Sequence, residues 1–223
     1  MTKEQQVALD AILREGGLDL GADAQTLRSA FEETMKQVPI AADVEQRRTT
    51  VGGVGTVEVT IRGADSSNVV LYFHGGVYVI GSAAASVPLV SELARRADTK
   101  AITVDYRLAP EHPFPAALED ARATYEGLLA QGVDPRRIAF AGESAGCGLA
   151  VAALLGLRDD GLPLPCGAFL MSPYVDLTLS GETLFPHGFQ GFAAMLEEGA
   201  AALDRAAIFL KTQLPDVRPT RAA

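Results

Sequence analysis

The sequence predicts an α/β fold with a doubly wound, mostly parallel sheet. Strand patterns alternate with helical patterns up to Phe169, an order that is typical of βαβ units. Two of the strand patterns run directly into glycine-rich turns, at His74-Gly75-Gly76 and at Gly142 to Gly146. With 223 residues and 48% hydrophobic content, we expect a single domain around one sizeable core.

The N-terminal part is predicted to be helical and then to enter the sheet. Residues 3–15 and 24–38 have the periodicity of amphipathic helices. In the second helix, four apolar residues recur on one face: Leu27, Phe31, Met35 and Val38. From Thr50 to Ile61, β-rich stretches flank Gly52-Gly53, which indicates a hairpin.

The remaining elements follow in order. Strands are predicted at residues 68–73, 101–104, 137–141 and 166–171, and helices at residues 147–155 and 193–214. Three prolines lie between Asp105 and Asp120 and predict an extended crossing before the next helix. We expect residues 215–223 to form a frayed tail.

The turn Gly142-Glu143-Ser144-Ala145-Gly146 lies between a strand and a small-residue helix. This G-x-S-x-G pattern predicts a nucleophile elbow, in which the bend is so tight that only glycine fits at both flanks. The Ser144 hydroxyl would then project above the sheet edge. The amides at the start of the helix, with the positive end of its dipole, would face any oxyanion formed there.

The loop His74-Gly75-Gly76-Val77 follows the strand predicted at 68–73. Its glycines allow close backbone approach, so that N–H groups can hold a developing negative charge. We predict that Gly76 and Val77, preceded by Gly75, donate to this charge together with the N–H of Ala145. His74 is expected to brace the loop.

Four ordered motifs carry a resemblance to a known family: residues 74–76, 105–120, 142–146 and 172–178. Over about residues 1–181, the chain resembles the hormone-sensitive-lipase-like α/β-hydrolase esterases, in their bacterial carboxylesterase branch. The resemblance implies an α/β-hydrolase fold and a cap to which the N-terminal helices contribute. Two residues depart from the family pattern. Val77 replaces a usual glycine, and Glu143 replaces a usual Asp.

The resemblance also predicts an internal deletion. In the family, cap helices, a strand that ends in the triad acid and a further helix precede the catalytic His loop. Here Ser180 to Leu184 runs straight into Phe185 to Phe192, which looks like that His loop. Because a βαβ unit needs about 30 residues or more, we expect roughly 70 to 90 residues to be missing after about residue 182.

The chain has three histidines, which narrows the choice of base. His74 precedes the oxyanion loop and His112 lies in the proline-rich crossing. His187 has the order and local sequence of the family's base, so Ser144 and His187 are the predicted nucleophile and base.

The triad acid stays unassigned. The carboxylates available between nucleophile and base are Asp159, Asp160, Asp176 and Glu182. Asp176 follows the strand at 166–171 at the ligand-binding end of the sheet, but the family uses the matching residue structurally.

These motifs predict a serine carboxylesterase that cleaves short- or medium-chain acyl esters without metal or organic cofactor and that is impaired by the missing acid segment. Two alternatives remain open, a non-catalytic binding module for small acyl ligands and an unstable fragment. They arise because the deletion would leave the strand at 166–171 as a new edge. Such an edge favours aggregation or pairing with another chain, so the sequence also leaves open that the protein forms a homo-oligomer.

The composition and sequence argue against nucleic-acid binding and a membrane span. A formal charge of −9 argues against nucleic-acid binding. The first residues lack an apolar signal core and no window of about 18 apolar residues occurs, so we expect a cytoplasmic protein without a membrane span. Cys147 and Cys166 show no ligand spacing and are predicted to be reduced core thiols.

Overall fold

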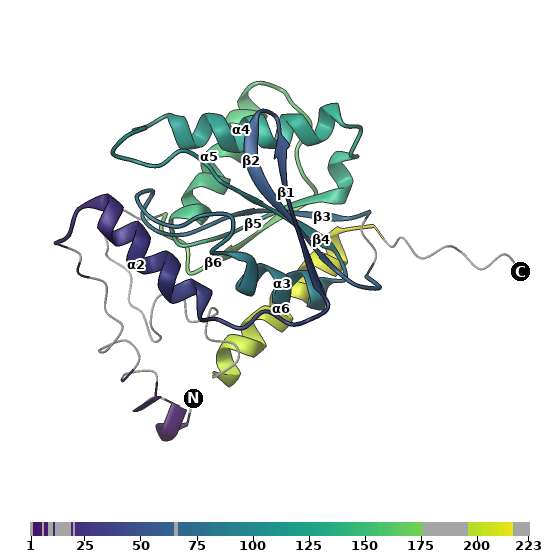
Figure 1. The fold of residues 1–223 in the computed structure, drawn as a ribbon. Helices are drawn as coiled ribbons and strands as arrows, with labels where there is room; N and C mark the ends of the chain where they lie inside the picture. The colour runs from purple at the N-terminus through teal and green to yellow at the C-terminus, as the bar shows by residue number, and fades with distance from the viewer. Residues whose placement is uncertain are drawn as a thin grey trace, which may run out of the picture.

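In the computed structural model, the described residues are 2–5, 7, 8, 11, 19, 21–64, 67–175 and 196–215. Within them, a central sheet lies between two layers of helices (Figure 1). The strands are β1 (Val44–Val51), β2 (Val54–Ile61), β3 (Val69–Phe73), β4 (Lys100–Val104), β5 (Ile138–Glu143) and β6 (Gly167–Met171). The helices are α2 (Ala24–Lys36), α3 (Val87–Ala97), α4 (Ala116–Ala130), α5 (Ala145–Asp159) and α6 (Glu197–Gln213), with a 3₁₀ turn η1 at Pro135–Arg137.

The strand order confirms the predicted sheet. It runs β1-β2-β4-β3-β5-β6. Strands β4, β3, β5 and β6 are mutually parallel, and β2 pairs antiparallel with both β1 and β4. The register pairs Val69 of β3 with Lys100 of β4 on one side and with Ile138 of β5 on the other. The carboxyl ends of β3 and β5 therefore lie next to each other, and both glycine-rich turns leave the sheet from there.

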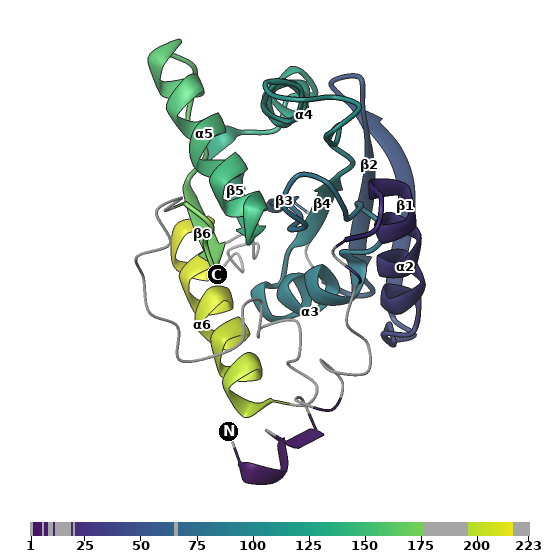
Figure 2. The ribbon, with the colours of Figure 1, turned by 90° about the vertical axis from the view of Figure 1, so that its left-hand side faces the viewer.

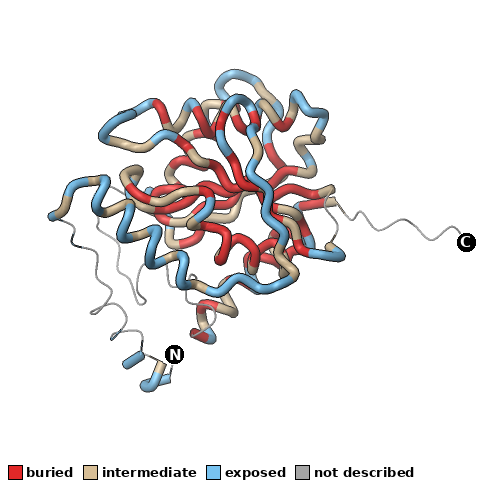
Figure 3. Tube along the Cα trace, viewed as in Figure 1, coloured by how far each residue is buried: buried red, intermediate tan, exposed pale blue. Residues whose placement is uncertain are grey.

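Alternation along the buried strands divides the core into two clusters. In β3, Val70 and Tyr72 pack on the side of α3 and α6. Leu71 and Phe73 pack on the side of α4 and α5. Figure 2 shows the two helix pairs on opposite faces, and Figure 3 shows that burial concentrates in the sheet and on the inner helix faces. Because β3 is buried on both faces, its sequence is apolar throughout.

Most element predictions hold, with shifts at the ends. The hairpin forms, but β1 begins at Val44, upstream of the predicted start. Most of β1 is exposed at the sheet edge, so polar residues on both sides hide its strand pattern.

The proline-rich crossing is not extended. Residues 109–112 form turns, and the N–H of His112 donates to the Leu108 carbonyl at 2.9 Å.

The terminal predictions are tested only in part. Helix α2 confirms the helix predicted at 24–38 and ends at Lys36. Of the helix predicted at 3–15, the structure describes residues 3–5, 7, 8 and 11, which are helical. The predicted His loop and residues 216–223 lie outside the described residues.

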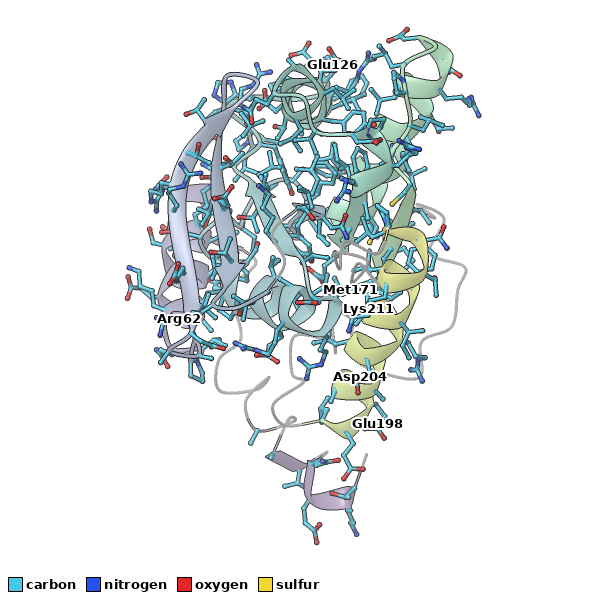
Figure 4. All side chains as sticks on the ribbon, turned by 90° about the vertical axis from the view of Figure 1, so that its right-hand side faces the viewer. Arg62, Glu126, Met171, Glu198, Asp204 and Lys211 are labelled. Carbon is cyan, nitrogen blue, oxygen red and sulfur yellow. The ribbon has the colours of Figure 1, made fainter. Side chains whose placement is uncertain are left out.

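Helix α6 packs on one face of β6. The rings of Phe169 and Phe209 lie 5.9 Å apart, and Met171 shares a buried cluster with Leu203 and Leu210. Figure 4 shows Met171 beside α6. Strand β6 is the last strand of the sheet within the described residues. Among all the described residues, no helix has the length and apolar character that crossing a membrane requires.

The turn between β1 and β2 packs backbone to backbone on α4. Gly52 and Gly53 both have positive φ, at 60° and 83°, as a two-residue hairpin turn requires. A Cβ at Gly52 would lie 1.8 Å from the Ala123 carbonyl oxygen, and one at Gly127 would lie 2.4 Å from the Gly52 nitrogen. A Cβ at Gly53 would meet nothing within 4 Å.

The two turn glycines form a matched pair for a stability test. Gly53→Ala should cost about 1–2 kcal/mol, because it adds only left-handed strain. Gly52→Ala adds the same strain and also a clash with α4, which should cost a further 1–3 kcal/mol or so. Urea denaturation of both variants measures the difference. Equal losses would contradict the packing of this turn on α4.

Candidate active site

Ser144 occupies the bend between β5 and α5, with φ 54° and ψ −120°. This left-handed conformation is strained for a residue with a Cβ. A Cβ at Gly142 would lie 2.6 Å from the Gly146 carbonyl, and one at Gly146 would lie 2.0 Å from the Phe73 carbonyl oxygen. Both flanks therefore require glycine, as the sequence predicts for a nucleophile elbow.

The end of β6 supports the elbow. The Ser144 N–H donates to the Met171 carbonyl at 3.0 Å, and the Tyr174 N–H donates to the Ser144 carbonyl at 3.2 Å. The Cys147 thiol donates to the carbonyls of Gly142 and Met171 at 3.1 and 3.3 Å. These bonds fix the bend from the neighbouring strand.

The His74-Gly75-Gly76 loop lies against the elbow. A Cβ at Gly75 would lie 3.1 Å from the Ser144 Cβ and 2.1 Å from the Glu143 Oε2. Gly76 has φ 110°, and a Cβ there would lie 2.2 Å from the Ile80 carbonyl oxygen. The loop backbone thus reaches the serine at a distance that side chains would prevent, and Ser144 is only 7% exposed beneath its neighbours.

The amides at this junction suit an oxyanion hole. Within the described part of the chain, the N–H groups of Gly76 and Val77 have no backbone acceptor. Ala145 is the first residue of α5, so its N–H has no acceptor within the helix. The loop also uses two consecutive residues with positive φ, Val77 at 49° and Tyr78 at 62°. Such conformations carry strain, above all for a β-branched residue.

His74 lies inside the protein beneath the loop. Its ring stacks on Tyr106 with centroids 4.1 Å apart, and its Nδ1 lies 2.7 Å from the Gly75 carbonyl oxygen. A carbonyl only accepts, so Nδ1 carries the proton in this bond. Burial lowers the pKa of His74 to about 4, which keeps the ring neutral. These contacts fit the expected bracing role.

Glu143 places a carboxyl group beside Ser144. Burial raises its pKa from 4.5 to about 7, because the charged form is poorly solvated there. Burial also raises the pKa of the Cys147 thiol, to about 12. Cys147 and Cys166 are both free thiols, as predicted, and Cys147 is held neutral beneath the elbow.

The other candidate residues fall into three groups. His187, Asp176 and Glu182 lie outside the described residues. Asp159 and Asp160 lie at the far end of α5, a helix of 15 residues, and so are about 20 Å from Ser144 along its axis. They pair with Arg158 and Arg122 respectively, which removes both as candidates for the triad acid. His112 is exposed in the proline-rich loop.

The proline-rich loop is fastened to the fold by its own charged residues. The Asp105 carboxylate accepts from the Ala83 N–H at 2.6 Å. The Asp120 carboxylate accepts from the Arg107 N–H at 2.8 Å and from its guanidinium at 2.9 Å. The two carboxylates therefore fix the conformation of this segment at both of its ends.

Sequence reasoning did not find the contact of Arg28 with this region. The Arg28 guanidinium donates to the carbonyl of Val79, two residues after the His74-Gly75-Gly76-Val77 loop, at 2.7 Å. An arginine on an amphipathic helix ordinarily faces solvent, and nothing in its local pattern shows a partner 51 residues away.

Comparisons with known proteins agree with this geometry. Residues 70–214 match a family model described as the alpha/beta hydrolase fold. The crystal structure of an esterase from the bacterial hormone-sensitive lipase family superposes with a TM-score of 0.88 at 28% identity, covering 96% of this chain and 100% of that one. This chain belongs to the hormone-sensitive-lipase-like α/β hydrolases.

Two curated relatives of this α/β hydrolase carry activity names. An acetyl-hydrolase of Streptomyces hygroscopicus is 51% identical over 111 residues, which are 50% of this chain and 37% of that protein. An esterase of Acinetobacter venetianus is 37% identical over 158 residues, 71% of this chain and 52% of that protein. The chain thus spans about half or less of the length of these relatives.

The strain at Val77 predicts a stabilising substitution. The Val77 side chain is 58% exposed, so its removal loses little burial. Val77→Gly should raise stability by about 0.5–1 kcal/mol, since the left-handed penalty exceeds the chain entropy that glycine adds. Val77→Ala keeps a Cβ and should gain less. Thermal melts of both variants test this, and a Val77→Gly protein that melts below wild type would refute it.

The raised pKa of Glu143 predicts a pH-dependent gain for Glu143→Gln. The unfolded chain loses this proton near pH 4.5 and the folded chain near pH 7, so the wild type loses stability as pH rises through this window. Glutamine cannot ionise. The variant should therefore gain about 2–3 kcal/mol on wild type between pH 5 and pH 8. Denaturant titrations at both pH values measure this gain, and a difference independent of pH would contradict it.

Proposed function

We propose that this hydrolase is a serine carboxylesterase that cleaves short- or medium-chain acyl esters through an acyl-enzyme intermediate. The observation that carries the proposal is the placement of Ser144. The residue stands in a strained bend at the start of α5, with the backbone of Gly75 packed directly against it. The names of the two curated relatives, an acetyl-hydrolase and an esterase, support the same class of reaction.

The chemistry follows from the groups at the junction. The Ser144 Oγ attacks the ester carbonyl carbon while a base takes its proton, and the carbonyl oxygen becomes an oxyanion. The amides of Gly76, Val77 and Ala145 would donate to this oxygen. The loss of one such donor typically costs about 10²–10³ in rate. The intermediate then collapses to the acyl-enzyme, and the alcohol leaves with the proton from the base.

We assign the base to His187 on its resemblance to the family's His loop, and we leave the acid unassigned. A triad without its tautomer-holding carboxylate loses about 10⁴ in rate in the serine-protease example. We therefore propose an impaired enzyme. Asp176 and Glu182 are the remaining candidates in the chain order, since Asp159 and Asp160 are engaged at the far end of α5.

Hydrolysis of p-nitrophenyl butyrate by the purified chain tests the proposal. Ser144→Ala should lower the rate by about 10³-fold or more. Ser91→Ala is the matched control. Ser91 is also a buried serine, but it lies on α3 and donates to the Pro88 carbonyl, so its variant should keep wild-type turnover.

Each contrary outcome points to one alternative. Equal rates for wild type and Ser144→Ala would refute the esterase. If butyrate esters then raised the melting temperature without turnover, the chain would be a binding module. Failure of the wild type to melt cooperatively would identify an unstable fragment.

A further inference from the structure

Helix α2 lies against the hydrolase core without a fully buried residue. Its predicted apolar face is only half-buried, at Leu27, Phe31 and Met35. The apolar burial that usually holds a surface helix is therefore small here. Within the described residues, Arg28 makes every side-chain hydrogen bond that joins α2 to the core.

The Arg28 guanidinium joins three segments at once. Its Nε donates to the Val79 carbonyl at 2.7 Å, and its Nη2 donates to the Ala109 carbonyl at 2.7 Å. Its two Nη atoms also form a paired contact with the Glu111 carboxylate, at 2.9 and 2.7 Å. The side chain is only 18% exposed. A rigid, planar donor set with this geometry is specific to arginine.

One acceptor of Arg28, the Val79 carbonyl, belongs to residues 76–80, the segment that carries the proposed oxyanion donors Gly76 and Val77 and is called the oxyanion loop below. The other acceptors belong to residues 109–111 of the adjoining proline-rich loop. The carbonyl of Gly76 accepts from the N–H groups of Val79 and Ile80, both at 2.9 Å. The carbonyl of Tyr78 accepts from the Ala109 N–H at 2.8 Å. Arg28 thus donates to the carbonyls of Val79 and Ala109, and these two residues are themselves hydrogen-bonded to the segment that contains the strained Val77 and Tyr78.

Strained backbone persists only where its surroundings over-determine it. Val77 and Tyr78 both have positive φ, and Val77 itself is 58% exposed, so its side chain contributes little packing. Other contacts must therefore stabilise this conformation. On the C-terminal side they include the hydrogen bonds from Arg28 and Ala109 and the contact of the Tyr78 ring with Tyr106.

We propose that Arg28 is a positioning residue that holds the oxyanion loop in its strained conformation from helix α2. The inference rests on the proposed esterase function for its catalytic consequence. The amides of Gly76 and Val77 keep their direction only while Val79 is anchored, and so α2 contributes to rate as well as to the cover of the site.

The charge on the partner of Arg28 fits this role. The hydrogen bonds from Arg28 lower the pKa of Glu111 to about 2. Glu111 is therefore ionised throughout the pH range of an esterase assay, and the pair does not titrate there. Its carboxylate keeps the guanidinium oriented toward the two carbonyls.

Steady-state kinetics of Arg28→Gln and Arg28→Lys on p-nitrophenyl butyrate test the proposal. Arg28→Gln should lower kcat about 10- to 100-fold and change KM less than about threefold, because the oxyanion forms only after the substrate has bound. Arg28→Lys offers one ammonium donor in place of the planar guanidinium, so its kcat should lie between those of wild type and Arg28→Gln. A normal kcat in Arg28→Gln would overturn the inference.

Arg95→Gln provides the matched control. Arg95 also forms a paired contact with a carboxylate, Asp43, but it joins α3 to the start of β1, away from the loop. This variant should melt at about the same temperature as Arg28→Gln and keep wild-type kcat. An equal loss of kcat in both variants would mean that Arg28 acts only through global stability, which would also overturn the inference.

Hydrogen exchange separates this inference from the proposed function. In Arg28→Gln, the amides of Val79 and Ile80 should exchange at least about tenfold faster than in wild type and in Arg95→Gln, since local opening of the loop becomes easier. This measurement needs no turnover. If wild type and Ser144→Ala hydrolyse the ester equally, the esterase proposal fails, and the exchange rates still decide the role of Arg28. Unchanged exchange in all variants refutes the anchor.

Discussion

The approach of two backbone turns at the carboxyl ends of β3 and β5 is the constraint on which the rest of the structure depends. The parallel pairing of these strands brings the Gly75 loop to the Ser144 elbow. A Cβ at Gly75 would meet the Ser144 Cβ and the Glu143 carboxylate, and one at Gly146 would meet the Phe73 carbonyl, so both positions require glycine. Val77, Tyr78 and Ser144 have positive φ at the same junction, and the surrounding hydrogen bonds keep the strained geometry in place.

The parts of the fold and site that could be predicted from the sequence are those encoded by local pattern. Buried strands such as β3 are apolar throughout, and the elbow combines a strand, a tight glycine turn and a helix within a short window. The edge strand β1 could not be delimited in this way, because solvent on most of its surface allows polar residues at nearly every position. The turns at residues 109–112 depend on hydrogen bonds that proline counting does not reveal.

The part of the site that the sequence could not show depends on contacts across long chain separations. Arg28 reaches Glu111 across 83 residues, and the Met171 carbonyl accepts from Ser144 across the β5–β6 pair. The character of Glu143 is likewise set by burial and not by its neighbours in sequence. A carboxyl beside the elbow is visible in the chain, but its raised pKa requires the packed loop above it.

The bond from the Ser144 amide to the Met171 carbonyl links this residue to the last strand of the described sheet. End strands open more readily than central ones, because only one neighbour shares their ladder. Each opening of β6 removes an acceptor from the elbow while the buried centre of the sheet stays intact. In the proposed esterase, the time that Ser144 spends in its reactive geometry would therefore depend on a local equilibrium at β6, the end strand of the described sheet, and a globally folded protein could still hold Ser144 out of position.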